Sequence, residues 1–482
     1  MDFSRRLAAL AITMSGRTQC VMMDVMNAMD SRDAPRTVII AGGRVVDPAS
    51  GLDETADVLV QGGSIAAIGR WLGRPDDAAI VDAAGLVVAP GFVDLHCHLR
   101  DPGQTHKETL ASGLAAAAAG GFTTVCCMPN TVPPLDSPAL VRSARERAAA
   151  VSPLHLHVIA ALSMGQSGER LAPLADLAAA GAVAFSDDGH PVWDDALMRE
   201  ALRAAATLDL PLSLHEEDPT LAAGGVMNAG AVAARLGLPG LPAAAEERMI
   251  ARDIALLAAS LDSRDAGRVT GQDGRTRLHI AHVSTMGAVE LVREARRRGL
   301  PISAEATPHH LTLTEDLTAH PWDGRPYDTR SKVNPPLRTS EDVAAVVAGL
   351  ADGTISCIAT DHAPHAEADK RRGYEDAAFG ISLFETALGS VLQLVHDGRL
   401  TLPTLVERLT VGPARLFGLT AGTLTIGGPA DVVVFDPDER WTVDASRFLS
   451  QGHNTPLDGA PLRGRVRLTL AAGYEAHAVT SG

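Results

Sequence analysis

The sequence predicts an α/β protein: a closed (β/α)8 barrel of the TIM type, with a small β-sandwich domain formed by both chain ends. Between about residues 90 and 416, apolar β-rich runs alternate eight times with helical stretches rich in Ala, Leu and Arg. Short β-rich segments lie on either side of this region. Polar residues able to bind a metal recur where the predicted strands end, which is the functional face of such a barrel.

The chain divides into four predicted parts. Residues 1–36 are expected to be a poorly ordered N-terminal extension; it resembles a secretory signal but lacks a clear cleavage site. Residues 37–89 are the first part of the small β domain, 90–416 the barrel and 417–482 the second part of the β domain. Two separate β domains are the alternative. No apolar run reaches the roughly 18 residues of a membrane helix.

The segments outside the barrel show the short runs and glycine-rich turns of β structure. Before the barrel, strands are predicted at 37–40, 43–46, 56–60 and 64–68, with turns at Gly42-Gly43, Asp47-Pro48 and Gly62-Gly63. After the barrel, strands are predicted at 431–435 and 464–470. Pairing between the two sets would make one small domain that the barrel interrupts.

The barrel prediction depends on the number of β-then-α units. The predicted strands end near His96, Asn130, Ser163, Asp188, His215, His282, Ala306 and Asp361. The helical stretches include 109–119, 139–149, 195–208, 246–260 and 288–298. An open doubly wound sheet is the alternative, but no Gly-x-Gly-x-x-Gly turn follows the first strand.

Composition excludes several partners. The formal net charge of −16 disfavours nucleic acid and anionic membranes, so a small-molecule substrate is expected. An anionic substrate would need locally positive groups, which metal ions and Arg100 would provide. The five scattered cysteines do not suggest a disulfide framework and fit a reducing cytoplasm.

A His-x-His pair follows the first barrel strand. Because side chains alternate along a strand, His96 and His98 share one face and can hold one metal ion, whereas Cys97 should point to the opposite face. Arg100 comes next, and its planar guanidinium suits a substrate carboxylate, although a surface salt bridge explains an arginine here equally well. A lone His-x-His is a weak signal, so the interpretation needs further ligands at other strand ends.

Four other strand ends supply such residues. Each has an ordinary explanation alone, as a turn, a structural histidine or a helix cap, but their coincidence with strand ends favours a metal site. They are Asp187 or Asp188, His215, His282 and Asp361. With the His-x-His pair this makes six ligands, too many for one catalytic zinc but suited to two metals that share a carboxylate. Such a centre predicts hydrolysis of an amide or ester, or its reversal.

Taken together, seven stretches resemble the bacterial dihydroorotases (class I type) of the amidohydrolase superfamily. They are residues 90–103, 121–125, 128–131, 185–189, 307–311, 332–338 and 360–365. The resemblance extends over about residues 37–476 and implies the barrel and the interrupted β domain. No lysine lies near Asp188, where many relatives such as hydantoinases carry a carboxylated lysine, and this favours a branch with a bridging aspartate.

The resemblance implies a role for each site residue. Two Zn²⁺ per chain would be bound by His96, His98, Asp188, His215, His282 and Asp361, with Asp188 as the bridge and Asp187 as the fallback. Asp361 would also be the catalytic proton shuttle. The substrate would contact His98, Arg100, Asn130, Asn334, His365, Phe379 and Gly380. Nitrogen and oxygen ligands of this kind also accept Mn or Co, so the native metal stays open.

The implied reaction is the reversible cyclisation of N-carbamoyl-L-aspartate to L-dihydroorotate, a step of de novo pyrimidine (UMP) biosynthesis. Two alternatives are another cyclic amidohydrolase, such as a hydantoinase or allantoinase, and a non-catalytic scaffold subunit of aspartate transcarbamoylase. Arg100 and Asn130 disfavour the first, and the complete set of ligands disfavours the second. Assembly into a homo-oligomer and association of an active enzyme with aspartate transcarbamoylase both stay open.

Overall fold

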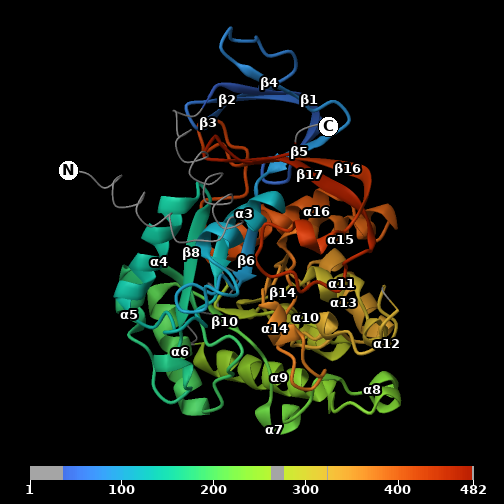
Figure 1. The fold of residues 1–482 in the computed structure, drawn as a ribbon. Helices are drawn as coiled ribbons and strands as arrows, with labels where there is room; N and C mark the ends of the chain where they lie inside the picture. The colour runs from blue at the N-terminus through green and yellow to red at the C-terminus, as the bar shows by residue number, and fades with distance from the viewer. Residues whose placement is uncertain (1–35, 262–275, 323, 480–482) are drawn as a thin grey trace, which may run out of the picture.

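The computed structural model describes residues 36–261, 276–322 and 324–479. The predicted N-terminal extension, apart from its last residue, lies outside the described residues. Figure 1 shows a large body of strands and helices with a smaller sheet above it, in which blue and red segments from the two chain ends lie together.

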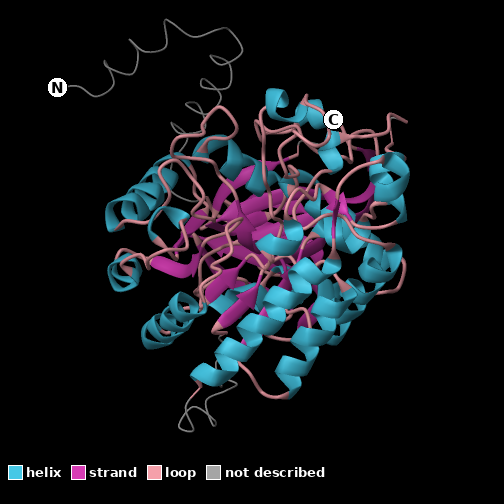
Figure 2. Cartoon of the chain, turned by 90° about the horizontal axis from the view of Figure 1, so that it is seen from below, coloured by secondary structure: helices cyan, strands magenta, loops and turns pink. Residues whose placement is uncertain are grey.

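Eight parallel strands form the barrel, and Figure 2 shows them at the centre of a ring of helices. They are β6 (Phe92–Cys97), β7 (Phe122–Cys127), β8 (His155–Ala161), β9 (Ala182–Ser186), β10 (Leu212–Leu214), β13 (Leu278–Ile280), β14 (Ile302–Ala306) and β15 (Cys357–Ile358), paired in this order. The backbone N–H of His98 donates to His362 O (2.8 Å) and that of Asp361 donates to His96 O (2.9 Å). These two bonds join the first strand to the chain after the last, which confirms the barrel.

Burial on both faces explains the near-continuous apolar strands. In β6 and β7 every residue is buried. One face of β6 contributes Val93 and Leu95 to the apolar filling of the barrel, together with Phe417. The other contributes Phe92 and Cys97 to the apolar layer beneath the helices.

The helices alternate with the strands as predicted. The longer ones are α3 (Leu110–Ala119), α4 (Pro138–Val151), α6 (Asp195–Leu208), α9 (Ala243–Ser260), α10 (Met286–Arg297), α13 (Ser340–Asp352), α15 (Phe384–His396) and α16 (Leu402–Leu409). The shorter ones are α5 (Leu174–Ala179), α7 (Pro219–Ala222), α8 (Ala231–Leu236), α11 (Pro308–Thr312), α12 (Asp316–Ala319), α14 (Glu367–Lys370) and α17 (Val411–Phe417). No helix in the described part is long and apolar enough to cross a membrane.

Both chain ends contribute to one eight-stranded sheet beside the barrel. Its strands are β1 (Val38–Asp47), β2 (Leu52–Gln61), β3 (Ser64–Gly69), β4 (Ala79–Asp82), β5 (Val87–Pro90), β16 (Val432–Thr442), β17 (Pro461–Ala471) and β18 (Tyr474–Ala478). Antiparallel pairing of β16 with β5 joins the two ends, with Val432 opposite Pro90. A separate sheet domain is therefore present, while its predicted boundaries at 89/90 and 416/417 stay predictions.

One local prediction is wrong. Gly42-Gly43 does not separate two strands but lies inside the single strand β1, where the register against β2 shifts between Ile40 and Gly43. Gly42 has a φ of +73°, and a Cβ at Gly43 would lie 2.5 Å from the Val88 side chain. Glycine is therefore needed here for a bulge and a close approach, two uses that the sequence pattern does not separate from a turn.

Candidate metal centre

Four histidines surround the carboxylate of Asp188 at the ends of the barrel strands. Asp188 Oδ1 lies 3.5 Å from His96 Nε2, 3.8 Å from His215 Nδ1 and 3.7 Å from His282 Nε2. Asp188 Oδ2 lies 3.6 Å from His98 Nε2. The five residues follow four different strands, so the closed barrel is what brings them together.

Asp361 completes the group from the end of β15. Its Oδ1 lies 2.9 Å from His98 Nε2 and 3.6 Å from His96 Nε2. The structure therefore gathers all six residues that the sequence analysis expected to bind metals.

The backbone is strained at three residues of this region. Arg100, His282 and Asp361 have φ values of +57°, +36° and +48°, in the left-handed region that non-glycine residues rarely adopt. Such strain persists where the surrounding structure enforces it, and it is concentrated at functional sites.

The buried donor atoms fit a metal ion. The ligand atoms of His96, Asp188 and His282 lie within 4.8 Å of one another, as do those of His96, His98 and Asp361. Within the described residues, the buried atoms His96 Nε2 and Asp188 Oδ1 have no hydrogen-bond partner. Buried polar atoms in folded proteins nearly always have one, so these atoms are arranged for a cation.

Hydrogen bonds on the far side of two rings determine which nitrogen faces this cation. The Nδ1–H of His96 donates to Glu305 Oε1 (2.7 Å), and the Nδ1–H of His98 donates to Asn130 Oδ1 (2.9 Å). When a metal takes the place of the second ring proton, each ring presents its Nε2 to the cluster, as a metal ligand must.

The electrostatics point the same way. Burial disfavours a positive charge on His96, but three neighbouring carboxylates outweigh burial and raise its pKa to about 10. Burial opposes the ionisation of Asp361, but the neighbouring histidines outweigh it, and its pKa is lowered. The centre thus favours positive charge among ionised carboxylates, which a bound metal would supply.

Asp187 lies outside this cluster. Its Oδ1 accepts from the backbone N–H of Leu162 (2.9 Å) and of Ser163 (3.0 Å), and its Oδ2 accepts from the Ser163 hydroxyl. These bonds hold the ends of β8 and β9 together, so Asp188 is the aspartate of the pair that faces the histidines.

Arg100 and His365 lie together beside the centre. Arg100 Nη2 is 3.2 Å from His365 Nε2, which is 2.8 Å from the carbonyl oxygen of Phe379. Lys107 Nζ donates to His365 Nδ1 (3.3 Å). Since Lys107 only donates, the neutral imidazole carries its proton on Nε2 and donates it to Phe379 O. Two donors therefore face each other, an arrangement that an anion would satisfy.

The other predicted substrate contacts are also near the cluster. Asn130 Nδ2 donates to Asp188 Oδ2 (3.4 Å). Asn334 Nδ2 donates to Glu217 Oε2 (2.9 Å) and lies 3.4 Å from His215 Nε2, while its buried Oδ1 has no partner within the described residues. Gly380 has a φ of +135°, and a Cβ there would lie 2.8 Å from Ala363, so glycine is needed.

The sequence analysis missed Glu305, which is fully buried on β14. Its Oε1 accepts from His96, and its Oε2 accepts from His279 Nε2–H (2.9 Å). His279 Nδ1 in turn accepts from the Ser303 hydroxyl (2.7 Å). The sequence signal that could have identified Glu305 was a carboxylate within an apolar barrel strand. A buried ionised carboxylate needs hydrogen-bond donors, which here are His96 and His279.

We expect Glu305→Gln to weaken metal binding by about 10–100-fold, because an amide cannot accept from both imidazoles and the orientation of His96 is lost. Competition with a chromogenic chelator measures this affinity. Ser303→Ala, which removes only the bond at the far end of the chain, is the matched control and should change it little. Equal metal affinity in wild type and Glu305→Gln would contradict the role.

Asn454, from the segment before β17, was also missed. Its Oδ1 accepts from His365 N (2.8 Å) and from the Ser382 hydroxyl (2.8 Å), and its Nδ2 donates to Ala363 O and Gly380 O (both 3.0 Å). This buried side chain therefore joins the two loops that carry His365 and Gly380, and no sequence spacing indicates such a contact.

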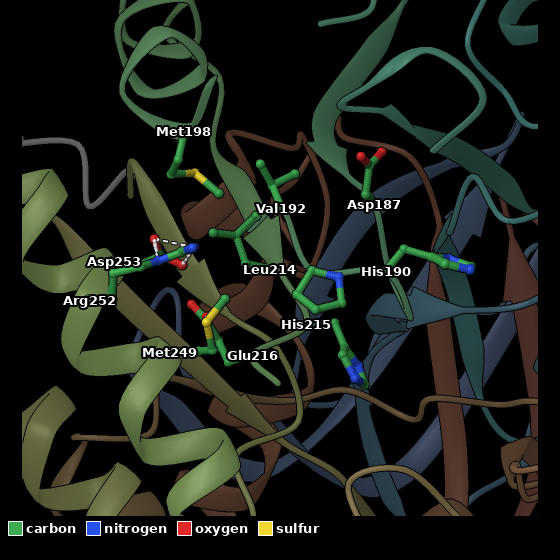
Figure 3. A pocket seen from close by; sticks show the side chains of 11 residues that line it. Asp187, His190, Val192, Met198, Leu214, His215, Glu216, Met249, Arg252 and Asp253 are labelled. Atoms are coloured by element: carbon green, nitrogen blue, oxygen red, sulfur yellow. Dashed lines mark hydrogen bonds and ion pairs between the residues drawn. The ribbon is translucent and has the colours of Figure 1, made fainter. Parts of the chain in front are cut away.

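A small cavity of about 10 Å³, enough for about one water, lies on the other side of the β10 end. In Figure 3, Glu216 and the ion-paired Arg252 and Asp253 line it, while His215 points away from them. Burial and the nearby Asp253 raise the pKa of Glu216 well above its ordinary value. The side chains of the adjacent His215 and Glu216 therefore point in different directions, as alternation along an extended chain requires.

Comparison with known proteins gives one consistent result. A family profile described as "Dihydro-orotase-like" matches residues 85–263. The chain is 51% identical to a dihydroorotase of Anaeromyxobacter sp. (strain K) over 440 residues, 91% of this chain and 98% of that protein. It is 46% identical to a dihydroorotase of Syntrophus aciditrophicus (strain SB), over 90% of this chain and 98% of that protein.

Among solved structures, an L-hydantoinase (dihydropyrimidinase) from Arthrobacter aurescens superimposes with a TM-score of 0.77. It is 28% identical, and the match covers 91% of this chain and 96% of that one. The fold, the ring of histidines and carboxylates, and the near full-length similarity agree, and the chain belongs to the dihydroorotase family of metal-dependent cyclic amidohydrolases.

Proposed function

We propose that this chain catalyses the reversible hydrolysis of L-dihydroorotate to N-carbamoyl-L-aspartate, as a step of pyrimidine synthesis in the cytoplasm. The observation that carries the proposal is the pair of facing donors, Arg100 and His365, beside a cluster suited to metals. Dihydroorotate has a carboxylate on a cyclic amide, and this carboxylate would supply the acceptor that the Arg100 N–H facing His365 lacks.

We further propose two Zn²⁺ per chain with Asp188 as the shared ligand. His96, His98 and Asp361 would hold one ion, and His215 and His282 the other. Supporting this division, Asp361 lies nearest His98, and His215 Nδ1 lies only 2.9 Å from His282 Nε2. When bound, the metals would lower the pKa of water and polarise the substrate carbonyl.

Each protein residue then has a defined task. Arg100 binds the substrate carboxylate through the N–H groups that its bond from Nε to Pro364 O (3.1 Å) leaves available. The carboxylate of Asp361 accepts the proton of the attacking water and passes it to the leaving ring nitrogen. Asn334 and the backbone at Phe379 and Gly380 contact the ring amide groups. His98 and Asn130, which are hydrogen-bonded to each other, also contact the substrate.

Hydantoinase activity is the second candidate, because solved hydantoinases share the fold. A hydantoin ring need not carry a carboxylate, so the buried Arg100 would have no anionic partner on the substrate in that reaction. This charged pocket favours dihydroorotate. Assembly into a homo-oligomer and association with aspartate transcarbamoylase stay predictions.

The test is ring opening of L-dihydroorotate, followed by ultraviolet absorbance, with metal content determined on the same sample. We expect turnover that a chelator abolishes and zinc restores. Absence of turnover with about two metals bound per chain would reject the proposed substrate; the binuclear count is that expected for such sites. Hydantoin and the transcarbamoylase would then be tried.

We expect Arg100→Met to lower kcat/KM for L-dihydroorotate by about 100-fold, because charge-assisted hydrogen bonds to the carboxylate are lost. Dihydrouracil, the same ring without a carboxylate, is the control substrate, and its turnover should change far less. Steady-state kinetics on both substrates measures the difference. Equal losses would mean that Arg100 supports the fold rather than the carboxylate.

A further inference from the structure

His309 is a buried side chain near the metal centre to which the proposed mechanism gives no task. It lies on α11, directly after β14. Its side chain is buried, and neither ring nitrogen has a hydrogen-bond partner within the described residues. An imidazole always offers at least one donor, and burying it unpaired is costly.

The neighbouring His310 provides a contrast. Its Nδ1 lies 2.9 Å from the hydroxyl of Thr307 and its Nε2 lies 3.0 Å from the carbonyl oxygen of Pro335. Both of its nitrogens are therefore satisfied, and it ties α11 to the segment that carries Asn334. The two rings are in contact, with centroids 4.4 Å apart, so the fixed ring of His310 holds His309 in place.

The topology brings His309 to the active-site end of the barrel. β14 lies between β13 and β15 in the sheet, so the chain that follows it emerges between His282 and Asp361. Burial is the largest effect and lowers the pKa of His309 to about 4, while the charge of Asp361 raises this pKa and that of His282 lowers it. At neutral pH the ring therefore carries one N–H donor and one bare nitrogen.

We propose that His309 is a further substrate-binding residue, whose imidazole hydrogen bonds to the amide group of the substrate ring. A ring amide offers an N–H and a C=O, which match the donor and the acceptor of a neutral imidazole. The substrate would supply the partners that the protein does not. This inference rests on the proposed function, because it requires a cyclic amide in the site.

The experiment compares His309→Leu, His309→Asn and His310→Leu with wild type in kcat/KM for L-dihydroorotate, bound metal per chain and Tm. We expect His309→Leu to lower kcat/KM about tenfold, which corresponds to about 1.4 kcal/mol. Its metal content should stay unchanged and its Tm should not fall, because an apolar group replaces unsatisfied polar atoms. His309→Asn should recover part of the loss. His310→Leu should lower the Tm, since two hydrogen bonds disappear.

Three results would overturn the inference. An unchanged kcat/KM in His309→Leu would mean that the ring does not touch the substrate. Loss of bound metal would assign His309 to the metals instead. A fall in Tm as large as that of His310→Leu, with kcat/KM preserved in His309→Asn and His309→Leu, would make it structural. Wild type is measured first: without turnover the proposed function fails as well, whereas turnover with an unaffected His309→Leu rejects only the inference about His309.

Discussion

Replacing Asp361 with asparagine is expected to reduce kcat for L-dihydroorotate by about 10³–10⁴-fold, toward the upper end of what a general acid–base contributes. Asparagine keeps the shape and one oxygen of the side chain, but it accepts no proton. The neighbouring histidines hold the pKa of Asp361 low despite its burial, so the wild-type residue is an ionised base. Stopped assays with metal content measured in parallel quantify the loss.

Glu367→Gln is the control for Asp361. Glu367 lies on the following short helix α14 and is exposed, and its carboxylate pairs with Arg371 at the surface. Removing that charge should leave both kcat and bound metal unchanged. Wild-type turnover in a folded Asp361→Asn variant would reject Asp361 as the residue that moves the proton.

Asp188→Asn is expected to have the second large effect, on metal binding. Four histidine nitrogens lie 3.5–3.8 Å from the two oxygens of Asp188, so this carboxylate would share its metal ions with all four histidines. In asparagine an NH2 group replaces one of the two oxygens, and its N–H groups would point at a bound metal ion and repel it. Metal affinity should fall by more than about 100-fold, beyond the loss seen for residues that only support a ligand. Elemental analysis after dialysis against chelator measures the retained metal.

The adjacent aspartate is the matched control. Asp187→Asn should keep the bound metal but lower the free energy of unfolding by about 1–3 kcal/mol, because the backbone N–H groups of Leu162 and Ser163 lose a charged acceptor. Denaturant unfolding and metal analysis on both variants separate the two effects. Loss of metal from Asp187→Asn with Asp188→Asn unaffected would exchange the proposed roles.

The residues at the strand ends were predictable because a closed parallel barrel places the C-terminal ends of all its strands at one face. Once alternating β and α segments indicate a closed parallel barrel, every strand must end at the same face. His96, His215 and His282, which are far apart in sequence, are then expected to meet. The prediction needed only the period of the pattern and the position of each polar residue after an apolar run.

Other features have no such signature. Gly42-Gly43 has the same composition whether it forms a turn or a bulge, and the approach of Val88 decides between them. Glu305 and Asn454 form hydrogen bonds with chain segments far away in sequence. The ring nitrogens of His309 have no hydrogen-bond partner among the described residues. A hydrogen-bond partner of that kind is determined by packing and not by spacing.

The sequence by itself determined the barrel with its added β domain and the set of histidines and carboxylates at one face, because apolar periodicity and strand direction are local properties of the chain. Only the tertiary structure decided that Asp188 rather than Asp187 faces the histidines. It also decided which nitrogens of His96 and His98 face the cluster. The physical reason is that each depends on hydrogen bonds to distant segments, which exist only after the barrel has closed.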